Sequence, residues 1–153
     1  MSTLEDTDYS GILIASDINE DFLTFSIIDS TVNGTLTYLD SITGAFTYSP
    51  VENYNGADSL SFSVSDGHLI DIGKVVFMIG AVNDPPTISP IDDITIIEDG
   101  TASIIVNAED IDGDDLEYGV TTGGPYFEVV IEGDTVTISP HLNWFGQTTI
   151  AVS

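Results

Sequence analysis

The sequence predicts an all-β chain folded as two tandem β-sandwich repeats, and three observations carry that prediction. A stretch of roughly 90 residues recurs within the 153-residue chain. Short segments alternate polar and apolar residues, which is typical of strands that turn one face toward a core. Clusters of Gly, Asn and Asp separate these segments, as turns require, and no window shows the apolar period of a helix. Short strands in a unit of this size are typical of a two-sheet sandwich.

The internal repeat appears when Glu5 is placed on Glu98, an offset of 98 − 5 = 93 residues. Residues 12–23 then align with residues 105–116 without a gap. Further along the chain, Tyr48-Ser-Pro and the residues that follow match Ile138-Ser-Pro at an offset of 138 − 48 = 90. Two matches in the same order and at nearly the same spacing indicate a tandem duplication.

The two repeats, residues 1–84 and 85–153, are expected to be incomplete at opposite ends. Residues 85–95 open the second repeat and have no counterpart in the first. Residues 74–79 belong to the first repeat and have no counterpart before the second one stops. We therefore expect the first repeat to lack its N-terminal strand and the second its C-terminal strand, as in a piece of a longer array.

The strand segments follow from alternation. Ser59–Ser65 is the clearest, and it predicts that Leu60, Phe62 and Val64 face a core. Three other segments of the first repeat alternate in the same way: residues 23–27, 35–39 and 46–49. Tyr54 and Trp144 occupy equivalent positions, so we expect both to pack in the structure rather than to bind a ligand.

The net charge of the chain limits the classes of partner that it can bind. The chain has 26 acidic residues, one Lys and no Arg, and its net charge is −25. Such a field repels nucleic acid and anionic membranes, so we expect neither as a partner. The absence of Cys excludes disulfides and thiolate sites, and no apolar run reaches the ~18 residues of a membrane span. The carboxylates need soluble cations for neutralisation, and Ca²⁺ suits clustered carboxylates.

Ala81-Val-Asn-Asp-Pro-Pro86 stands between the repeats. With the Glu-Asp pairs at 5-6 and 98-99, the acidic loops at 17–21 and 110–114 and Asn53-Tyr-Asn-Gly56, this segment resembles the cadherin-like repeats of large bacterial surface proteins, with the dystroglycan-type subgroup nearest. The resemblance implies immunoglobulin/cadherin-like Greek-key sandwiches, an extracellular location and Ca²⁺ at repeat junctions. The family's linker acid is replaced here by Ala81.

Carried over to this chain, the resemblance implies three groups of Ca²⁺ ligands. The junction between the repeats would use Glu5, Asn83, Asp84, Asp110 and Asp112. An upper half-site of the first repeat would use Asp17, Asn19 and Asp66. Glu98 would be the contribution of the second repeat to a following domain. The implied function is a Ca²⁺-stiffened stalk that supports cell adhesion, with neighbouring repeats and a homophilic or carbohydrate surface as partners.

Other functions stay open at this point. The loop at Asp110 fails the EF-hand template because Gly113 comes two places early. Phe145, with Tyr126 and Phe127, offers a surface for sugar stacking, so a polysaccharide-binding module is an alternative. A passive acidic spacer is a third possibility. The sequence has no nucleophile-elbow motif and no zinc-type His cluster, and we expect no enzymatic activity.

Overall fold

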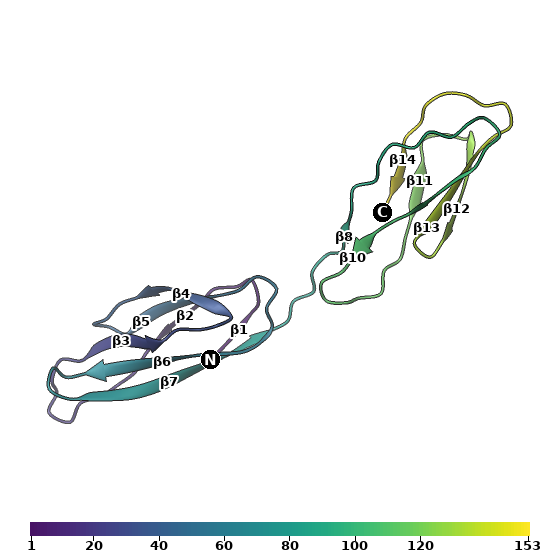
Figure 1. Cartoon of the computed structure of the whole chain (residues 1–153). Helices are drawn as coiled ribbons and strands as arrows, with labels where there is room; N and C mark the ends of the chain where they lie inside the picture. Colours follow the sequence, from purple (N-terminus) through teal and green to yellow (C-terminus); the bar gives the residue numbers. More distant parts are fainter. The chain divides into compact units, whose positions relative to one another are not determined.

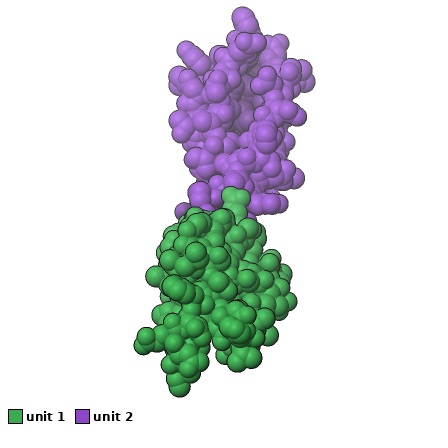
Figure 2. Space-filling model, turned by 90° about the vertical axis from the view of Figure 1, so that its left-hand side faces the viewer, with its two compact units in different colours: residues 1–83 green, residues 84–153 purple.

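The computed structural model describes all 153 residues and contains fourteen strands and no helix. The chain divides into unit 1, Met1–Asn83, and unit 2, Asp84–Ser153 (Figures 1 and 2). Unit 1 contains β1 (Ser2–Leu4), β2 (Tyr9–Ile12), β3 (Thr24–Asp29), β4 (Gly34–Leu39), β5 (Ala45–Pro50), β6 (Gly56–Ser65) and β7 (Ile70–Gly80). Unit 2 contains β8 (Thr87–Ile88), β9 (Ala102–Ile105), β10 (Ala108–Glu109), β11 (Val120–Thr122), β12 (Phe127–Glu132), β13 (Thr135–Pro140) and β14 (Ile150–Val152). The all-β prediction is confirmed.

Unit 1 is a sandwich of two sheets, visible as two layers in Figure 1. One sheet has the order β1-β7-β6-β3 and the other β2-β5-β4. The longest pairing is the antiparallel ladder between β6 and β7, which runs from Gly56↔Ile79 to Ser65↔Ile70. β1 pairs with the other edge of β7 in parallel. β7 is therefore held on both edges, and its position fixes one side of the sandwich.

The core of unit 1 draws on both sheets. Its buried apolar residues are Leu13, Phe25, Phe46, Tyr48, Leu60, Phe62, Val75, Phe77 and Ile79. The predicted alternation of β6 is confirmed, because Leu60 and Phe62 are buried and Val64 packs against the core. Phe77 from β7 stacks on Tyr48 from the opposite sheet, with ring centroids 4.0 Å apart. The alternate residues of β7 thus close the core from one side.

Unit 2 repeats the pairing of unit 1 with the same register. Ala102 faces Ile138 across β9 and β13, just as Tyr9 faces Tyr48 across β2 and β5. Its sheets are β12-β13-β9, β11-β14 and β10-β8. The buried apolar residues are Val106, Val136 and Ile138. By the offsets of 93 and 90 these are the counterparts of Leu13, Phe46 and Tyr48, so the two repeats share the centre of one core.

The two units differ at their edges. Unit 2 contains β8, paired with β10, and unit 1 has no equivalent strand. Unit 2 in turn has no strand equivalent to β7. Residues 95–97 correspond to β1 by the offset of 93, yet they form no strand, because β1 exists in unit 1 only by pairing with β7. Each unit thus has an edge pairing that the other does not show.

One exchange between the units shows how the repeat keeps its core filled. Gly34 pairs with Pro50, and a Cβ on Gly34 would lie 2.3 Å from the Tyr48 ring. In unit 2 the residue paired with Pro140 is Phe127, and the smaller Ile138 replaces Tyr48. The larger residue of the pair is thus on β5 in unit 1 and on β12 in unit 2, as expected where two side chains fill one volume in the core.

Candidate metal-binding loops

Three carboxylates meet at one end of unit 1, the end at which β7 begins. Asp17 and Asp21 lie in the loop between β2 and β3, and Asp66 lies in the turn between β6 and β7. One carboxylate oxygen from each lies within 4.8 Å of the others. Asp17 and Asp66 were predicted from the sequence, whereas Asp21 was not among the predicted ligands. Its recurrence as Asp114 in the aligned loop was the signal that pointed to it.

Backbone hydrogen bonds fix the loops that carry these carboxylates. Asp17 Oδ1 accepts hydrogen bonds from the amides of Asn19 at 2.7 Å and Asp21 at 3.1 Å. Asn19, a predicted ligand, thus contributes a backbone donor to the loop. Asp66 Oδ1 accepts hydrogen bonds from the amides of Leu69 and His68, both at 2.6 Å. These donors, led by the Leu69 amide, hold the pKa of the Asp66 carboxyl below its usual value.

The same loop recurs in unit 2. Asp110 Oδ1 accepts hydrogen bonds from the amides of Asp112 at 2.9 Å and Asp114 at 3.3 Å, which matches the contacts of Asp17. The amide of Asp84, at the start of the unit, donates to Asp112 Oδ2 at 2.7 Å. Backbone amides therefore link Asp84 to the loop of Asp110 and Asp112, three of the residues that the resemblance assigned to one junction, whereas the carboxylate cluster of unit 1 has no equivalent here.

Glu5 lies at the opposite end of unit 1, where β7 ends. Its side chain is only 2% exposed. Its Oε1 accepts a hydrogen bond from the Val82 amide at 2.5 Å, and Asn55 Nδ2 approaches its Oε2 at 3.5 Å. Asn55 was not predicted as a neighbour of Glu5. Asn83 is the exposed last residue of the unit. The counterpart of Glu5 in unit 2, Glu98, is exposed.

Two acids that recur in the repeat, Asp6 and Asp99, have a structural role. Asp6 Oδ1 accepts a hydrogen bond from the Asn53 amide at 2.9 Å, and Asp99 Oδ1 accepts one from the Asn143 amide at 2.8 Å. All four residues have positive φ angles between 56° and 61°, a conformation that Asn and Asp tolerate better than other residues. The Glu-Asp pair that marks each repeat thus includes one residue that fastens two turns.

Asp58 is a buried carboxylate that sequence reasoning missed. It is 6% exposed, and it accepts hydrogen bonds from the amides of Val32, Asn33 and Ser59 and from the Tyr48 hydroxyl at 3.0 Å. Burial and the nearby Asp58 raise the pKa of Tyr48 far above its usual value. Asp58 ties the turn before β4 to β6, and nothing comparable exists in unit 2 because Thr148 stands at its aligned position.

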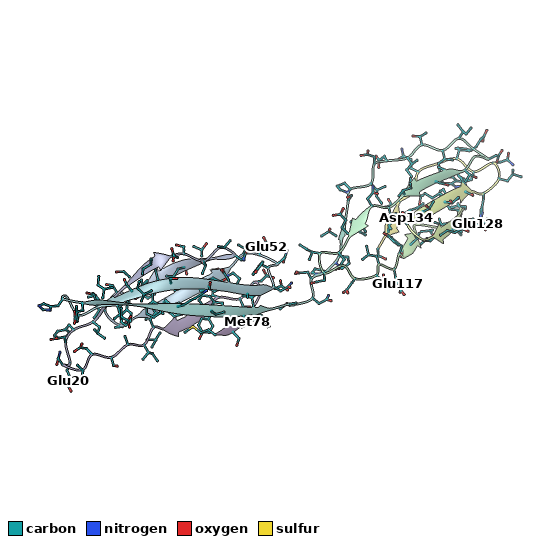
Figure 3. The ribbon with its side chains drawn as sticks, turned by 60° about the horizontal axis from the view of Figure 1, so that its bottom comes forward. Glu20, Glu52, Met78, Glu117, Glu128 and Asp134 are labelled. Atoms are coloured by element: carbon teal, nitrogen blue, oxygen red, sulfur yellow. The ribbon has the colours of Figure 1, made fainter.

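Most of the acidic side chains project into solvent, and Figure 3 shows this for Glu20, Glu52, Glu117, Glu128 and Asp134. The aromatic residues of unit 2 pack mainly on one another. Trp144 meets Phe127 edge-on at 4.6 Å and stacks on Tyr126 at 6.0 Å. Phe145 is 86% exposed. The surface considered for sugar stacking is therefore reduced to Phe145 and the outer face of Tyr126.

Structural comparisons place both units among immunoglobulin-like sandwiches. N-cadherin EC1-4 from Drosophila matches with a TM-score of 0.57 and 17% identity, over 99% of this chain and 42% of that one. Human protocadherin-24 EC1-2 matches with a TM-score of 0.53 and 16% identity, over 99% of this chain and 88% of that one. At these identities the likeness concerns the fold alone.

Another similar structure is an endo-fucoidan hydrolase of glycoside hydrolase family 107, with a TM-score of 0.47 and 20% identity, over 93% of this chain. The chain spans 23% of the length of that hydrolase, and a TM-score below 0.5 carries no argument. No curated protein sequence matches the chain. The structure contains no helix that is long and apolar enough to cross a membrane.

The sequence also matches a family model, and it does so twice. The model is that of the bacterial Ig domain, and its two matches cover residues 1–77 and 83–153. These matches fall on the two units that the fold separates. The finer, dystroglycan-type assignment stays an expectation. The chain belongs to the bacterial Ig domain family and contains two members of it in tandem.

Proposed function

We propose that this chain is a Ca²⁺-binding repeat module of a large bacterial cell-surface or secreted protein, in which bound ions stiffen an extracellular stalk that supports adhesion. The observation that carries the proposal is the cluster of Asp17, Asp21 and Asp66, whose oxygens lie within 4.8 Å of one another. Three carboxylates at this spacing repel one another unless a cation lies among them. The chain has one Lys and no Arg, so its own cationic side chains cannot neutralise its 26 acidic residues.

The chemistry of the loops favours Ca²⁺ over other ions. Ca²⁺ takes 6–8 oxygen ligands in flexible geometry, whereas Mg²⁺ demands a near-ideal octahedron. Carboxylates, the Asn19 amide group and backbone carbonyls are all oxygen donors within the loops. The chain offers no Cys and only two His, which disfavours zinc and copper. We also propose as Ca²⁺ ligands the other residues that the sequence predicted: Glu5, Asn83 and Glu98, and Asp84, Asp110 and Asp112 of unit 2.

Stiffening follows from the position of the loops. Each acidic loop joins two strands at the end of its unit, and an ion fixes the loop by neutralising charges that otherwise push it open. In this proposal the partners are neighbouring repeats of the same polypeptide and a homophilic or carbohydrate surface, and the chain has no catalytic activity. The loops would then act as mechanical joints.

Thermal unfolding across a Ca²⁺ series tests the proposal, with Mg²⁺ and matched ionic strength as controls. Extracellular Ca²⁺ modules bind at ~10⁻⁴–10⁻³ M, and an ion at ~100 times its dissociation constant adds about 2.7 kcal/mol per site. That gain should raise the unfolding midpoint by about 10–20 °C for units of this size. Hydrogen exchange of the loop at Asp66 and fluorescence of Trp144, the only Trp, follow the two units separately.

Charge-removing variants locate the ions. Asp66→Asn keeps an acceptor for the two backbone donors but removes the charge, so it should abolish the Ca²⁺ response of unit 1. Asp112→Asn should do the same for unit 2, and Asn83→Ala tests the predicted ligand of the linker. Glu52→Gln, an exposed acid outside the loops, is the matched control. An equal response to Ca²⁺, Mg²⁺ and NaCl would contradict the proposal and leave the passive acidic spacer.

A further inference from the structure

The outer face of the sheet β1-β7-β6-β3 in unit 1 displays a row of apolar side chains that the core does not use. The residues of β7 alternate, and the row, here called the ridge, consists of those that point away from the core: Ile70, Ile72, Lys74, Val76 and Met78. Its four apolar members are between 45% and 71% exposed, and Met78 is labelled in Figure 3. A contiguous row of large, exposed apolar side chains favours contact with another protein surface.

Strand β6 presents a row of small side chains beside the ridge. Each ridge residue pairs with one residue of this row, here called the trough, and in the order from Met78 to Ile70 its members are Ala57, Ser59, Ser61, Ser63 and Ser65. Neighbouring strands lie about 4.8 Å apart, so the trough runs next to the ridge along its whole length. A ridge and a trough of equal length, side by side on one face, make a surface that is complementary to itself.

The charges on this face complement each other as well. The strands of the sheet carry three acidic residues, Asp29, Asp58 and Asp71. Asp58 is buried, and Asp71 is one of the alternate residues of β7 on the side of the core, so only Asp29 shares the outer face with Lys74. Ser61 pairs with Asp29 on one side and with Lys74 on the other. The only Lys of the chain therefore lies in line with a single acid, and the two charges cancel.

We propose that this face binds the same face of a second copy of this chain. The two sheets pack face to face with their strands running in the same direction, and the ridge of each copy lies on the trough of the other. Lys74 of each copy then stands over Ser61 of the other, one strand away from its Asp29, and two-fold symmetry forms this ion pair twice. The opposite strand direction is disfavoured, because a two-fold axis across the strands lays ridge on ridge and, in register, Lys74 against Lys74.

Charge selects the occupant of this face. The chain has a net charge of −25, so two copies repel each other in most orientations. The outer face of this sheet carries one acid and one base, and a second copy supplies the matching base and acid at the matching places. Each copy therefore satisfies both charges of the other, which an uncharged or uniformly acidic partner does not do.

The size of the face indicates a weak, transient contact. β6 has 10 residues and β7 has 11, so the two strands are about 35 Å long, and with β3 the face measures roughly 500 Å² in each copy. A total of about 1,000 Å² is at the lower end of specific interfaces. This inference names the surface for the homophilic partner in the proposed function and rests on that function in this respect, since a weak contact gains strength when it recurs along an array.

Sedimentation equilibrium of the full 153-residue chain tests the proposal, in a chelating buffer with about 0.15 M NaCl, which limits the repulsion between the acidic chains to a range of ~8 Å. The chelator separates this test from the proposed Ca²⁺ function, so the two proposals fail independently. We expect a monomer–dimer equilibrium. Ile72→Asp should weaken the association at least tenfold, because it places an unpaired carboxylate in the ridge. Ile12→Asp, in the other sheet, adds the same charge at a similarly exposed Ile and is the matched control, which should associate within about threefold of the parent chain.

Exchanging the two charges tests the geometry. Lys74→Glu faces Asp29 of the second copy, and Asp29→Lys faces its Lys74, so each variant alone should associate at least tenfold more weakly than the parent. In an equimolar mixture of the two variants, every contact between these positions again joins one acidic and one basic side chain, and the mixture should associate as the parent does. Asp29→Lys also lowers the net negative charge, so an effect of net charge alone would strengthen its association.

Three outcomes overturn the proposal. One is the absence of any association that depends on protein concentration. Another is equal association of the Ile72→Asp and Ile12→Asp variants, which would assign the contact to a different surface. The third is a mixture of Lys74→Glu and Asp29→Lys that stays monomeric although the parent dimerises, which would exclude the arrangement with parallel strands.

Discussion

Units 1 and 2 are built from the same repeat, yet nine apolar side chains are buried in the core of unit 1 and three in that of unit 2. The three are counterparts of Leu13, Phe46 and Tyr48. Phe46 and Tyr48 lie on β5 and Leu13 directly follows β2, and both strands have counterparts in unit 2. The other six residues all lie in the four-stranded sheet of unit 1, on β3, β6 and β7. Each fully buried apolar side chain contributes about 1.5–3 kcal/mol, so this sheet supplies most of the burial free energy of unit 1.

The comparison also shows that the hydrogen bonds within the loops are the same in both units, although the burial of their cores differs. The hydrogen bonds of Asp17 recur at Asp110, and that of Asp6 recurs at Asp99. These bonds link residues within a loop or between adjacent turns, and none of them involves β7. The acidic loops are therefore properties of the repeat itself, and the core is a property of the complete sandwich.

The largest effect expected from this comparison comes from Phe77. Phe77→Ala should destabilise unit 1 by about 3–5 kcal/mol, because it leaves a cavity beside Tyr48. Val76→Ala, on the opposite face of the same strand and 45% exposed, should cost about 1 kcal/mol or less. Urea unfolding followed by hydrogen exchange of β6 amides measures both. Equal costs for the two variants would contradict the role given to β7.

A smaller effect is expected for the pair Gly34 and Tyr48 of unit 1, whose places in unit 2 are taken by Phe127 and Ile138. It tests whether the two side chains of such a pair fill one shared volume. Gly34→Ala should cost about 1–3 kcal/mol, because its Cβ meets the Tyr48 ring. In a Tyr48→Ile background the same change should be nearly neutral, which gives a coupling of about 1–3 kcal/mol in the double-mutant cycle. Denaturant midpoints of the four proteins supply the cycle. Additive costs would mean that the two positions do not share one volume.

The smallest effect concerns the pH dependence of Asp66. Backbone donors lower its pKa in the folded chain, so its contribution to stability is fully present above the ordinary Asp pKa of ~3.9. That contribution is lost as the pH falls through the lowered folded pKa. NMR titration of the Asp66 carboxyl carbon should show a midpoint below the ordinary value, and saturating Ca²⁺ should lower it further. A midpoint at the ordinary value would contradict the loop geometry.

Particular residues show how far sequence reasoning reached. The predicted strands around Leu60, the duplication at an offset of 93 and the packing of Trp144 are confirmed. Asp17 and Asp66 lie close together, and their role as a Ca²⁺ half-site stays a prediction. Asp21 was missed although it recurs as Asp114, because recurrence alone does not show which acidic side chains of a loop point toward one another. The register of the loop decides that.

The burial of polar residues could not be predicted from the sequence, because it depends on partners that are distant along the chain. Asp58 reads as one more acid in an acidic chain, yet four donors from three segments gather around it. Glu5 was predicted as a metal ligand, and the structure adds its burial against Val82 and Asn55. Such partners are distant along the chain, so no local pattern reveals them.

The sequence by itself determined that this chain is all-β, duplicated and strongly acidic, because alternation, recurrence and charge are local properties that residue order records directly. Only the tertiary structure decided which carboxylates meet and which acids are buried. The physical reason is that these features depend on strand pairing across the sheet. Residues 95–97 lie 93 positions after β1, yet only β1 forms a strand, and it does so by pairing with β7.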